Sequence, residues 1–148
     1  MANTIKLKKY SDVIEELVAA SAITPGMLVE EASTGKAQAH STAGGNAVVM
    51  FALEDELQGK EIDDDYAADD PVQVWVPYRG DQVNAILVDG ESVAIGDFLE
   101  SNGDGTLRKL ASGEPIAQAR EALDLSDSSG GEESGALGYN KRIKIRVM

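Results

Sequence analysis

Cysteine is absent from the 148-residue chain, and histidine occurs once, as His40. The first absence excludes disulfides, thiol nucleophiles and zinc sites built on sulfur. One imidazole excludes a three-histidine metal site, and no Gly-x-Ser-x-Gly segment supplies a serine nucleophile. The glycine-rich fingerprints of phosphate and dinucleotide sites are also missing. We therefore expect no catalytic constellation, no metal and no cofactor, and we interpret His40 as a surface or rim residue.

Long apolar runs are absent too. None approaches the ~18 residues that a membrane helix needs, and the N-terminus lacks a signal-peptide core. We therefore expect no membrane partner. A chain of 148 residues with 43% apolar side chains is long enough to bury a core without covalent staples.

Positive charge is scarce and lies mostly at the two ends. The chain has 26 acidic residues against 13 basic ones, for a net charge of −13. The basic residues of the two ends are Lys6, Lys8 and Lys9, then Lys141, Arg142, Lys144 and Arg146. An acidic body repels phosphates, and the ends lack arginines interleaved with aromatic residues. We therefore expect no nucleic-acid partner.

Alternation of apolar and polar residues recurs along the chain and predicts strands. Two such runs, 72–76 and 83–87, are separated by turn residues and predict a hairpin. Asp89-Gly90 and the segment 102–105 (NGDG) predict tight turns. Residues 143–147 predict a half-buried strand with a basic outer face. The pattern as a whole predicts an all-β protein, a small β-barrel or sandwich.

Helical spacing is a minority signal. Residues 12–20 place Val13, Leu17 and Ala20 on one helical face, with Asp12 as a candidate N-cap. The segment 116–125 has helical propensity as well. Its position in an internal repeat nevertheless favours a strand.

That repeat relates the two halves of the chain. Residues 25–40 (PGMLVEEASTGKAQAH) match residues 95–110 (IGDFLESNGDGTLRKL) at a constant offset of 70. The match aligns Gly26 with Gly96, Leu28 with Phe98 and Gly35 with Gly105. An apolar stretch, an acidic loop and an alternating strand follow in each half. We predict two pseudo-repeats, 23–76 and 93–147, that together close one barrel in a domain spanning 23–148.

Residues 1–22 precede the repeat and have no counterpart in its second half, so we predict an extended N-terminal arm. Ordering about twenty residues costs more free energy than burying its apolar side chains returns. We therefore expect the arm to be mobile when alone, and deletion of residues 2–20 to leave the barrel folded. Its alternating start suits addition to a sheet edge of a partner. The predicted partner-contact residues are Ile5, Lys6, Leu7, Lys8, Lys9, Tyr10, Val13, Ile14 and Leu17.

Three further segments are read more simply. The acidic stretch 54–70 and the Ser/Gly-rich stretch 126–138 are predicted to be mobile. The oxygen-bearing residues of 102–106 invite a calcium reading, but Leu107 stands where an EF-hand loop requires glycine. The tripeptide 79–81 (RGD), which integrins read, is interpreted as a chance match in a turn.

The glycine-anchored strand pairs of 25–40 and 95–110, the apolar strand after each and the preceding arm resemble the head decoration, or cement, proteins of tailed bacteriophages. The resemblance covers about residues 23–147. It implies a small β-barrel that forms a homotrimer on the outside of an expanded capsid, with arms or loops clamping capsid subunits. It implies a non-enzymatic structural protein of the virion, made in the host cytoplasm, whose partners are the major capsid protein and itself. This chain differs from the small members of that family in its length, its basic start and its long acidic loop.

Two alternatives stay open. One is an adaptor of a virion tail or baseplate, or another assembly protein rich in strands. The other is an oligomeric β-barrel enzyme whose site forms between subunits, which would carry a compact set of polar residues at strand ends.

Overall fold

The computed structural model describes residues 3–10, 12–126 and 141–148, and these ranges contain strands and one short 3-10 helix but no α-helix. The strands are β1 (Lys6–Lys8), β2 (Val13–Val18), β3 (Val29–Glu31), β4 (Ala37–Ala39), β5 (Phe51–Ala52), β6 (Pro71–Val76), β7 (Gln82–Leu87), β8 (Ser92–Val93), β9 (Phe98–Ser101), β10 (Leu107–Lys109), β11 (Ala117–Ala119), β12 (Leu123–Asp124) and β13 (Lys141–Val147), and the 3-10 helix η1 is Glu56–Gln58. No helix in the described ranges is long and apolar enough to cross a membrane.

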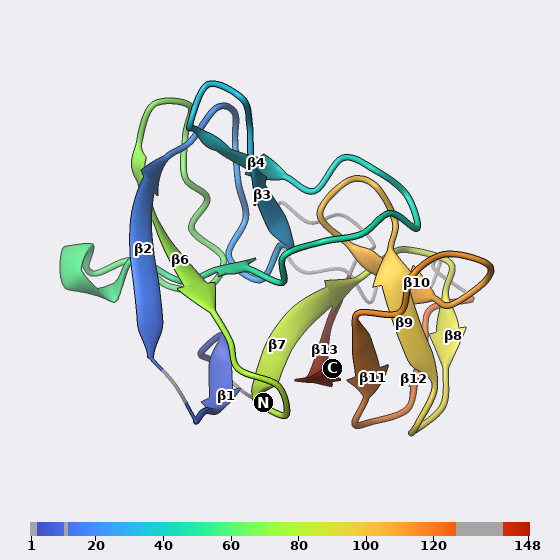
Figure 1. The fold of residues 1–148 in the computed structure, drawn as a ribbon. Helices are drawn as coiled ribbons and strands as arrows, with labels where there is room; N and C mark the ends of the chain where they lie inside the picture. The colour runs from blue at the N-terminus through green and yellow to red at the C-terminus, as the bar shows by residue number, and fades with distance from the viewer. Residues whose placement is uncertain (1–2, 11, 127–140) are drawn as a thin grey trace.

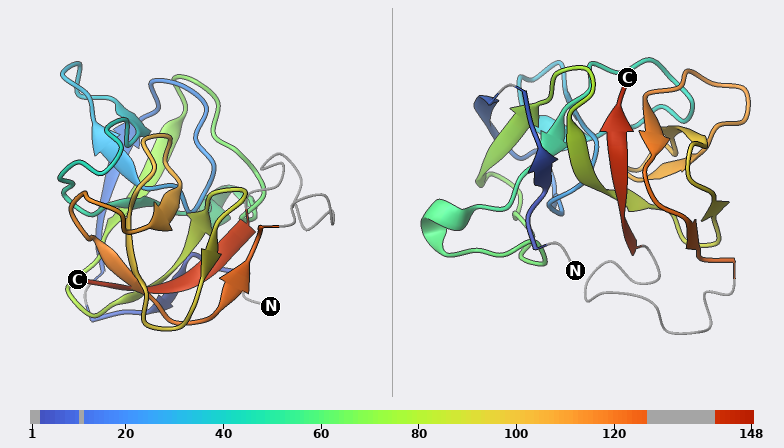
Figure 2. Two further views of the ribbon diagram at one scale, coloured as in Figure 1. Left: turned by 90° about the vertical axis from the view of Figure 1, so that its right-hand side faces the viewer. Right: turned by 90° about the horizontal axis from the view of Figure 1, so that it is seen from below.

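Strand β7 and four strands of the second predicted repeat close a five-stranded β-barrel. Around the ring, β7 pairs with β13, β13 with β11, β11 with β9, β9 with β10, and β10 returns to β7 through a parallel contact between Leu107 and Leu87. Figure 2 shows β13, in red, alongside β7, in yellow-green. The predicted fold class, an all-β protein with a small β-barrel, is therefore confirmed.

The first repeat follows the same ring order. Its strands β2, β6 and β5 form one sheet and β3 pairs with β4. Single bridges complete the ring: Ala19 pairs in parallel with Ala37, and Leu28 pairs antiparallel with Phe51. The two rings lie side by side in Figure 1. The prediction that both repeats together close one barrel is therefore wrong, because the strands of each repeat close a separate ring. Each ring is completed by a strand that lies before the predicted start of its repeat, β2 in the first and β7 in the second.

Matching hydrogen bonds confirm the pseudo-repeat. The N–H of Gly26 donates to the carbonyl of Ala52 (2.8 Å), and the N–H of Gly96 donates to that of Ala119 (2.9 Å). Both glycines have positive φ, 98° and 92°, which only glycine adopts without strain. The segment 116–125 contains β11 and β12, so its prediction as strand is confirmed.

The segment 12–20 forms strand β2, and its helical reading is wrong. β2 pairs with β6 over all six residues, as β7 pairs with β13 in the second repeat. The N–H of Ala20 donates to Ala37 (2.8 Å), and the N–H of Val88, 68 residues later, donates to Leu107 (2.9 Å). β2 is thus the counterpart of β7 that the sequence comparison did not find. Its β-branched residues favour the extended state once β6 provides a partner.

Strand β1 is also built into the fold. It pairs antiparallel with the start of β7, and the N–H of Asn84 donates to the carbonyl of Ile5 (2.8 Å). The N–H of Ile5 donates to the carboxylate of Glu54 (3.2 Å), and the Ile5 side chain is fully buried. The expectation of a separate arm is therefore corrected, and so is the expectation that deleting residues 2–20 leaves the barrel intact, because the deletion removes β1 and one wall of the first barrel.

Two hydrophobic cores correspond to the two barrels. The smaller core lies in the first barrel and contains Ala19, Ile23, Val29, Ala37, Met50, Ala52, Tyr66, Val72 and Val74. The larger core fills the second barrel and extends into the junction, where the first repeat contributes Leu28, Phe51, Leu53 and Trp75. Trp75 and Phe51 are the largest fully buried side chains. They join the two barrels into one packed unit.

Polar contacts at the junction are equally close. Gly44 of the first repeat and Gly113 of the second lie against each other, and the N–H of Glu114 donates to the Gly44 carbonyl (3.0 Å). The fully buried Glu100 accepts hydrogen bonds from the Gly113 N–H (2.7 Å) and from Arg108 Nε (2.9 Å). This pairing compensates the cost of burying the carboxylate.

The predicted turns have mixed outcomes. The hairpin over 72–88 is wrong: β6 and β7 do not pair, because the turn between them carries the chain from one barrel to the other. Asp89-Gly90 does make a turn, but the following strand β8 pairs with β12. The 102–105 turn joins the antiparallel strands β9 and β10, as predicted. β13 alternates buried and more exposed residues over 143–147 as predicted.

The acidic stretch 54–70 is anchored at two points, which corrects its reading as a mobile loop. Tyr66 is buried and donates its hydroxyl to the carbonyl of Leu53 (2.6 Å), and this burial raises the pKa of Tyr66 to about 12. Arg142 on β13 donates to the carboxylate of Asp63 (2.9 Å) and to the carbonyls of Pro25 and Ile62. The other stretch, 126–138, lies outside the described residues apart from its first position.

Replacing Ile5 with alanine tests whether β1 belongs to the fold. Ile5 is fully buried, so Ile5→Ala should lower the free energy of unfolding by about 2–5 kcal/mol. Ile14→Ala is the matched control, because Ile14 is 40% exposed and should lose less than about 1.5 kcal/mol. Urea unfolding measures both values, and equal effects would show that β1 is a loose appendage after all.

The glycine contact at the junction makes a second stability prediction. A Cβ on Gly113 would lie 2.2 Å from Glu100 Oε2 and 2.4 Å from Gly44 Cα. Gly113→Ala should therefore cost about 1–3 kcal/mol through overpacking. Gly113 is not among the glycines with positive φ, so this cost comes from overpacking alone. Gly35→Ala shows the opposite case, strain without overpacking: Gly35 has a φ of 82° with nothing within 4 Å of the added Cβ, and the variant should cost about 1–2 kcal/mol. Rescue of Gly113→Ala by Glu100→Ala in urea unfolding is not expected; full rescue would mean that the backbone contact with Gly44 is unimportant.

Candidate partner-binding surface

A buried aspartate organises the corner where β1 leads to β2. Asp81, which is 2% exposed, accepts hydrogen bonds from the N–H of Tyr10 (2.5 Å) and from the N–H of Tyr78 (2.8 Å). Its own backbone is tied to β13 through the N–H of Val147 (2.9 Å). Asp81, the third residue of the RGD tripeptide, therefore has a structural role inside the fold. Its occurrence in this turn has a structural explanation.

The same corner presents apolar side chains to solvent. The rings of Tyr10 and Tyr78 lie 6.1 Å apart at 60°, and they are 86% and 62% exposed. Val13 and Ile14 follow at the start of β2 and are exposed as well. Val13 pairs with Val76, two residues before Tyr78. We call Tyr10, Val13, Ile14 and Tyr78 the N-terminal patch. Exposed tyrosines with a fixed backbone are typical of protein-binding surfaces, because they offer large contact area at low entropic cost.

Two lysines of this segment hold the corner together. Lys6 Nζ and Lys9 Nζ each lie 2.8 Å from a carboxylate oxygen of Asp12. Hydrogen bonds from Lys6 and then Lys9 lower the pKa of Asp12 to about 2. Asp12 therefore stays ionised at any physiological pH, and its single negative charge offsets one of the two positive charges of these lysines.

The structure divides the nine predicted contact residues into two groups. Those directed inward or half-buried are Ile5, Lys6, Leu7 and Leu17, and those exposed are Lys8, Lys9, Tyr10, Val13 and Ile14. The second group exposes its side chains to a partner, and contact with a partner stays a prediction for all nine. The sequence did not reveal Tyr78 as a member of the patch or Asp81 as the buried residue that holds it, because no local pattern links them to Tyr10.

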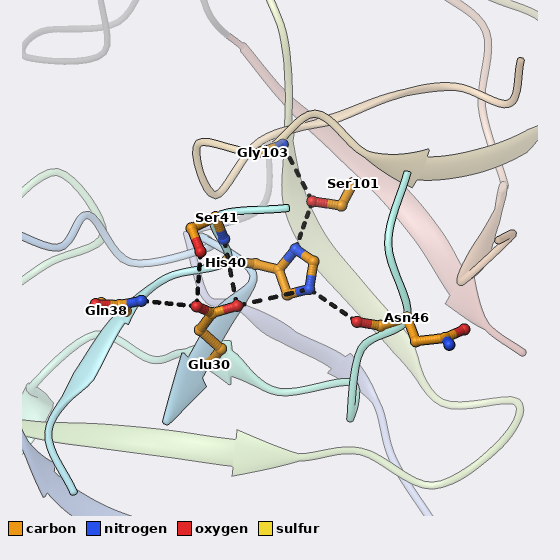
Figure 3. A network of polar contacts seen from close by, with 7 residues as sticks. All are labelled: Glu30, Gln38, His40, Ser41, Asn46, Ser101 and Gly103. Atoms are coloured by element: carbon orange, nitrogen blue, oxygen red, sulfur yellow. Dashed lines mark hydrogen bonds and ion pairs between the residues drawn. The ribbon is translucent and has the colours of Figure 1, made fainter. Parts of the chain in front are cut away.

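His40 lies in the interior, which corrects its reading as a surface or rim residue. Its Nδ1 is 2.7 Å from Ser101 Oγ, and its Nε2 is 3.0 Å from the Asn46 carbonyl and 3.7 Å from Glu30 Oε1 (Figure 3). Since a carbonyl only accepts, we assign the proton to Nε2, and the Ser101 hydroxyl donates to Nδ1. Ser101 Oγ also accepts from the N–H of Gly103 (3.1 Å). The network joins the two repeats.

The residue types of this network are those of a hydrolase triad, but the geometry does not expose a nucleophile. Ser101 is fully buried, and Nε2 of His40 faces the Asn46 carbonyl. Glu30 is held by Gln38 Nε2 (2.6 Å) and the Ser41 hydroxyl (2.8 Å). Partial burial raises the pKa of Glu30, but these hydrogen bonds outweigh it and the pKa is lowered. The group crosslinks the barrels and presents no reactive atom to solvent.

In the part of the chain that the structure describes, no three His, Asp or Glu side chains converge to form a metal-binding site. In the 102–106 turn, Asp104 Oδ1 accepts from the N–H (3.0 Å) and hydroxyl (2.5 Å) of Thr106. Partial burial raises the pKa of Asp104, yet these bonds lower it overall. The carboxylate thus stabilises the hairpin turn.

An acidic cleft of about 410 Å³ opens beside β2 and β6. Its lining residues are Glu16, Asp55, Leu57, Gln58, Lys60, Asp64, Asp65, Tyr66, Asp70, Pro71 and Gln73. Five acidic residues thus face a single lysine. The helix η1, which carries the exposed Leu57, projects from this side of the molecule (Figure 1).

Comparison with protein-family models and with curated proteins finds no match to this chain. Function is therefore inferred from the surface chemistry described above and from the resemblance of the glycine-anchored strand pairs.

Replacing Asp81 with asparagine should loosen the corner that holds the N-terminal patch. An amide offers one acceptor oxygen in place of two, so the N–H of Tyr10 or of Tyr78 loses its partner. We expect a loss of about 1–3 kcal/mol in the free energy of unfolding and a weaker NMR contact between the two rings. Asp65→Asn, at an exposed position, should change stability by less than about 0.5 kcal/mol. An unchanged ring contact in Asp81→Asn would contradict this role for the carboxylate.

Proposed function

We propose that this protein is a non-enzymatic structural protein that binds the outer surface of a viral capsid and stabilises it. The observation that carries its protein-binding part is the N-terminal patch, in which exposed tyrosine and aliphatic side chains are held by the buried Asp81. The capsid as partner rests on the resemblance of residues 25–40 and 95–110 to phage head decoration proteins.

The architecture suits such a role. Two barrels share a packed junction through Trp75 and Phe51, so a load applied at one face is transmitted through a continuous core. Val13 and Ile14 of the patch lie on β2, which pairs with β6, and Tyr10 lies between β2 and β1, which pairs with β7. A partner that binds the patch therefore contacts a preorganised surface, which lowers the entropic cost of association.

The major capsid protein and further copies of this chain are the partners in this proposal, with the virion as the location and host cytoplasm as the place of synthesis. A homotrimer follows from the resemblance, and closed symmetry would present three N-terminal patches together. Several weak contacts on one oligomer then reinforce one another through effective concentration. The net charge of −13 disfavours nucleic acid as a partner.

Co-sedimentation with undecorated, expanded phage heads tests the proposal. The full-length protein should coat them at a saturable, stoichiometric level and raise their resistance to heat. The double variant Tyr10→Ser/Ile14→Ser should bind at least tenfold more weakly, equivalent to about 1.4 kcal/mol, because it removes the centre of the apolar contact.

Ile95→Ser serves as the control, since Ile95 is 66% exposed on the second repeat and outside the N-terminal patch. It should bind as the wild type does. Failure of the wild-type protein to coat any undecorated head would count against the capsid and in favour of a tail or baseplate adaptor. Light scattering of the free protein measures the proposed trimer separately.

A further inference from the structure

The internal repeat shows how a strand could pair with the outer edge of β2, because β1 pairs with the same edge of the equivalent strand β7. β2 and β7 occupy equivalent places in the two barrels: each begins its ring, and each makes the parallel closing contact at its end, Ala19 with Ala37 and Leu87 with Leu107. The first half of the outer edge of β7 is covered by β1. In the described ranges, β2 pairs along its length only with β6 and stands at the end of its sheet.

On the outer edge of β7, main-chain groups bind β1. The corresponding main-chain groups of β2 point away from β6. Glu16 lies opposite Gln73, and the carbonyl of Gln73 accepts from Leu53 (2.8 Å) on the far side of β6. Glu16 and Gln73 are therefore a non-hydrogen-bonded pair, so the N–H and C=O of Glu16 point outward. The equivalent residue on β7, Asn84, uses its N–H to bind the carbonyl of Ile5 (2.8 Å). Because the direction of the main-chain groups alternates along a strand, the N–H and C=O groups of Ile14 and Val18 also point outward.

The side chains around this edge select the kind of strand that fits. Ile14 and Val18 are about 40% exposed, and Glu15 and Glu16 lie between them. Glu16 also lines the acidic cleft, where its carboxylate accepts from Gln73 Nε2 (2.7 Å). The edge therefore combines apolar contact at two points with negative charge between and beside them. A strand that alternates apolar and basic side chains is complementary to it.

The chain itself contains a strand of that chemistry on the equivalent edge. β1 and the residue before it read Ile5-Lys6-Leu7-Lys8, and Ile5 is fully buried where β1 covers β7. We propose that the edge of β2 binds an extended partner segment of alternating aliphatic and lysine or arginine side chains, which adds to β2 as β1 adds to β7. This inference rests on the proposed function, and it names the chemistry of the partner segment. Main-chain bonds supply affinity and the alternate side chains supply specificity.

A peptide titration of the full-length protein tests it. The probe is a fluorescein-labelled peptide of residues 3–9, NTIKLKK, read by fluorescence anisotropy. β1 occupies the edge of β7 in the same chain, so the added peptide reports on the edge of β2. The control peptide NTKILKK has the same composition without the alternation. We expect saturable binding of the first peptide and at least tenfold weaker binding of the second.

Two variants of Glu16 separate the main-chain bond from the charge. Glu16→Pro removes the outward N–H, and an edge strand tolerates proline at such a position. It should weaken binding at least tenfold. Glu16→Gln keeps the N–H and should weaken binding two- to threefold. In the wild-type protein, amide exchange at Ile14, Glu16 and Val18 should slow when peptide is added, a readout that does not depend on the folding of any variant.

Equal binding of the two peptides, unchanged binding by Glu16→Pro, or slowed exchange on β7 in place of β2 would overturn the inference. Capsid binding distinguishes it from the proposed function. Heads that bind Glu16→Pro as tightly as wild type would overturn the role of this edge and leave capsid binding standing. Wild-type protein that binds the peptide but coats no head would overturn capsid binding alone.

Discussion

Strand β7 is buried over all six of its residues, and it pairs with β13 on one edge and with β1 and β10 on the other. Its pairing with β13 closes the second barrel, and its parallel contact with β10 fixes the ring order. β1 pairs with the part of this β7 edge that β10 does not cover. The N-terminal patch is linked to this strand as well, because Asp81, which holds Tyr10 and Tyr78, lies directly before β7.

The N-terminal segment contributes both to the core and to the exposed surface, whereas the sequence predicted partner contact for all of it. Ile5 contributes to the larger core, while Tyr10, Val13 and Ile14 remain exposed. The chain passes from buried to exposed side chains at the corner where Asp81 accepts a hydrogen bond from the N–H of Tyr10. A buried carboxylate that binds backbone donors costs less than an unsatisfied one. The hydrogen bonds that Asp81 accepts from the N–H groups of Tyr10 and Tyr78 also explain why these two exposed rings keep their positions.

The repeat has an asymmetry with chemical consequences. Both halves share ring order, turn glycines and closing contacts, yet only β7 has an extra strand on its outer edge among the described residues. Exposed strand edges invite association, and proteins usually protect them with charge. Here Glu15 and Glu16 provide that protection against identical acidic strands, because two copies of β2 side by side would place like charges together. The same charge favours a basic partner strand.

The sequence by itself determined the all-β class, the repeat of the glycine turns, the β9–β10 hairpin and the alternation of β13, because each depends on local spacing and on glycines with positive φ. Its nine candidate residues included Tyr10, Val13 and Ile14 of the N-terminal patch but not Tyr78. Only the tertiary structure decided that each repeat closes its own barrel, that β6 and β7 do not pair, that β2 is the counterpart of β7, and that His40 is buried against Ser101. These features depend on pairings between residues that are distant in the chain. Period-two alternation shows that a residue lies on a strand and which face it occupies, but it does not show which strand lies beside it.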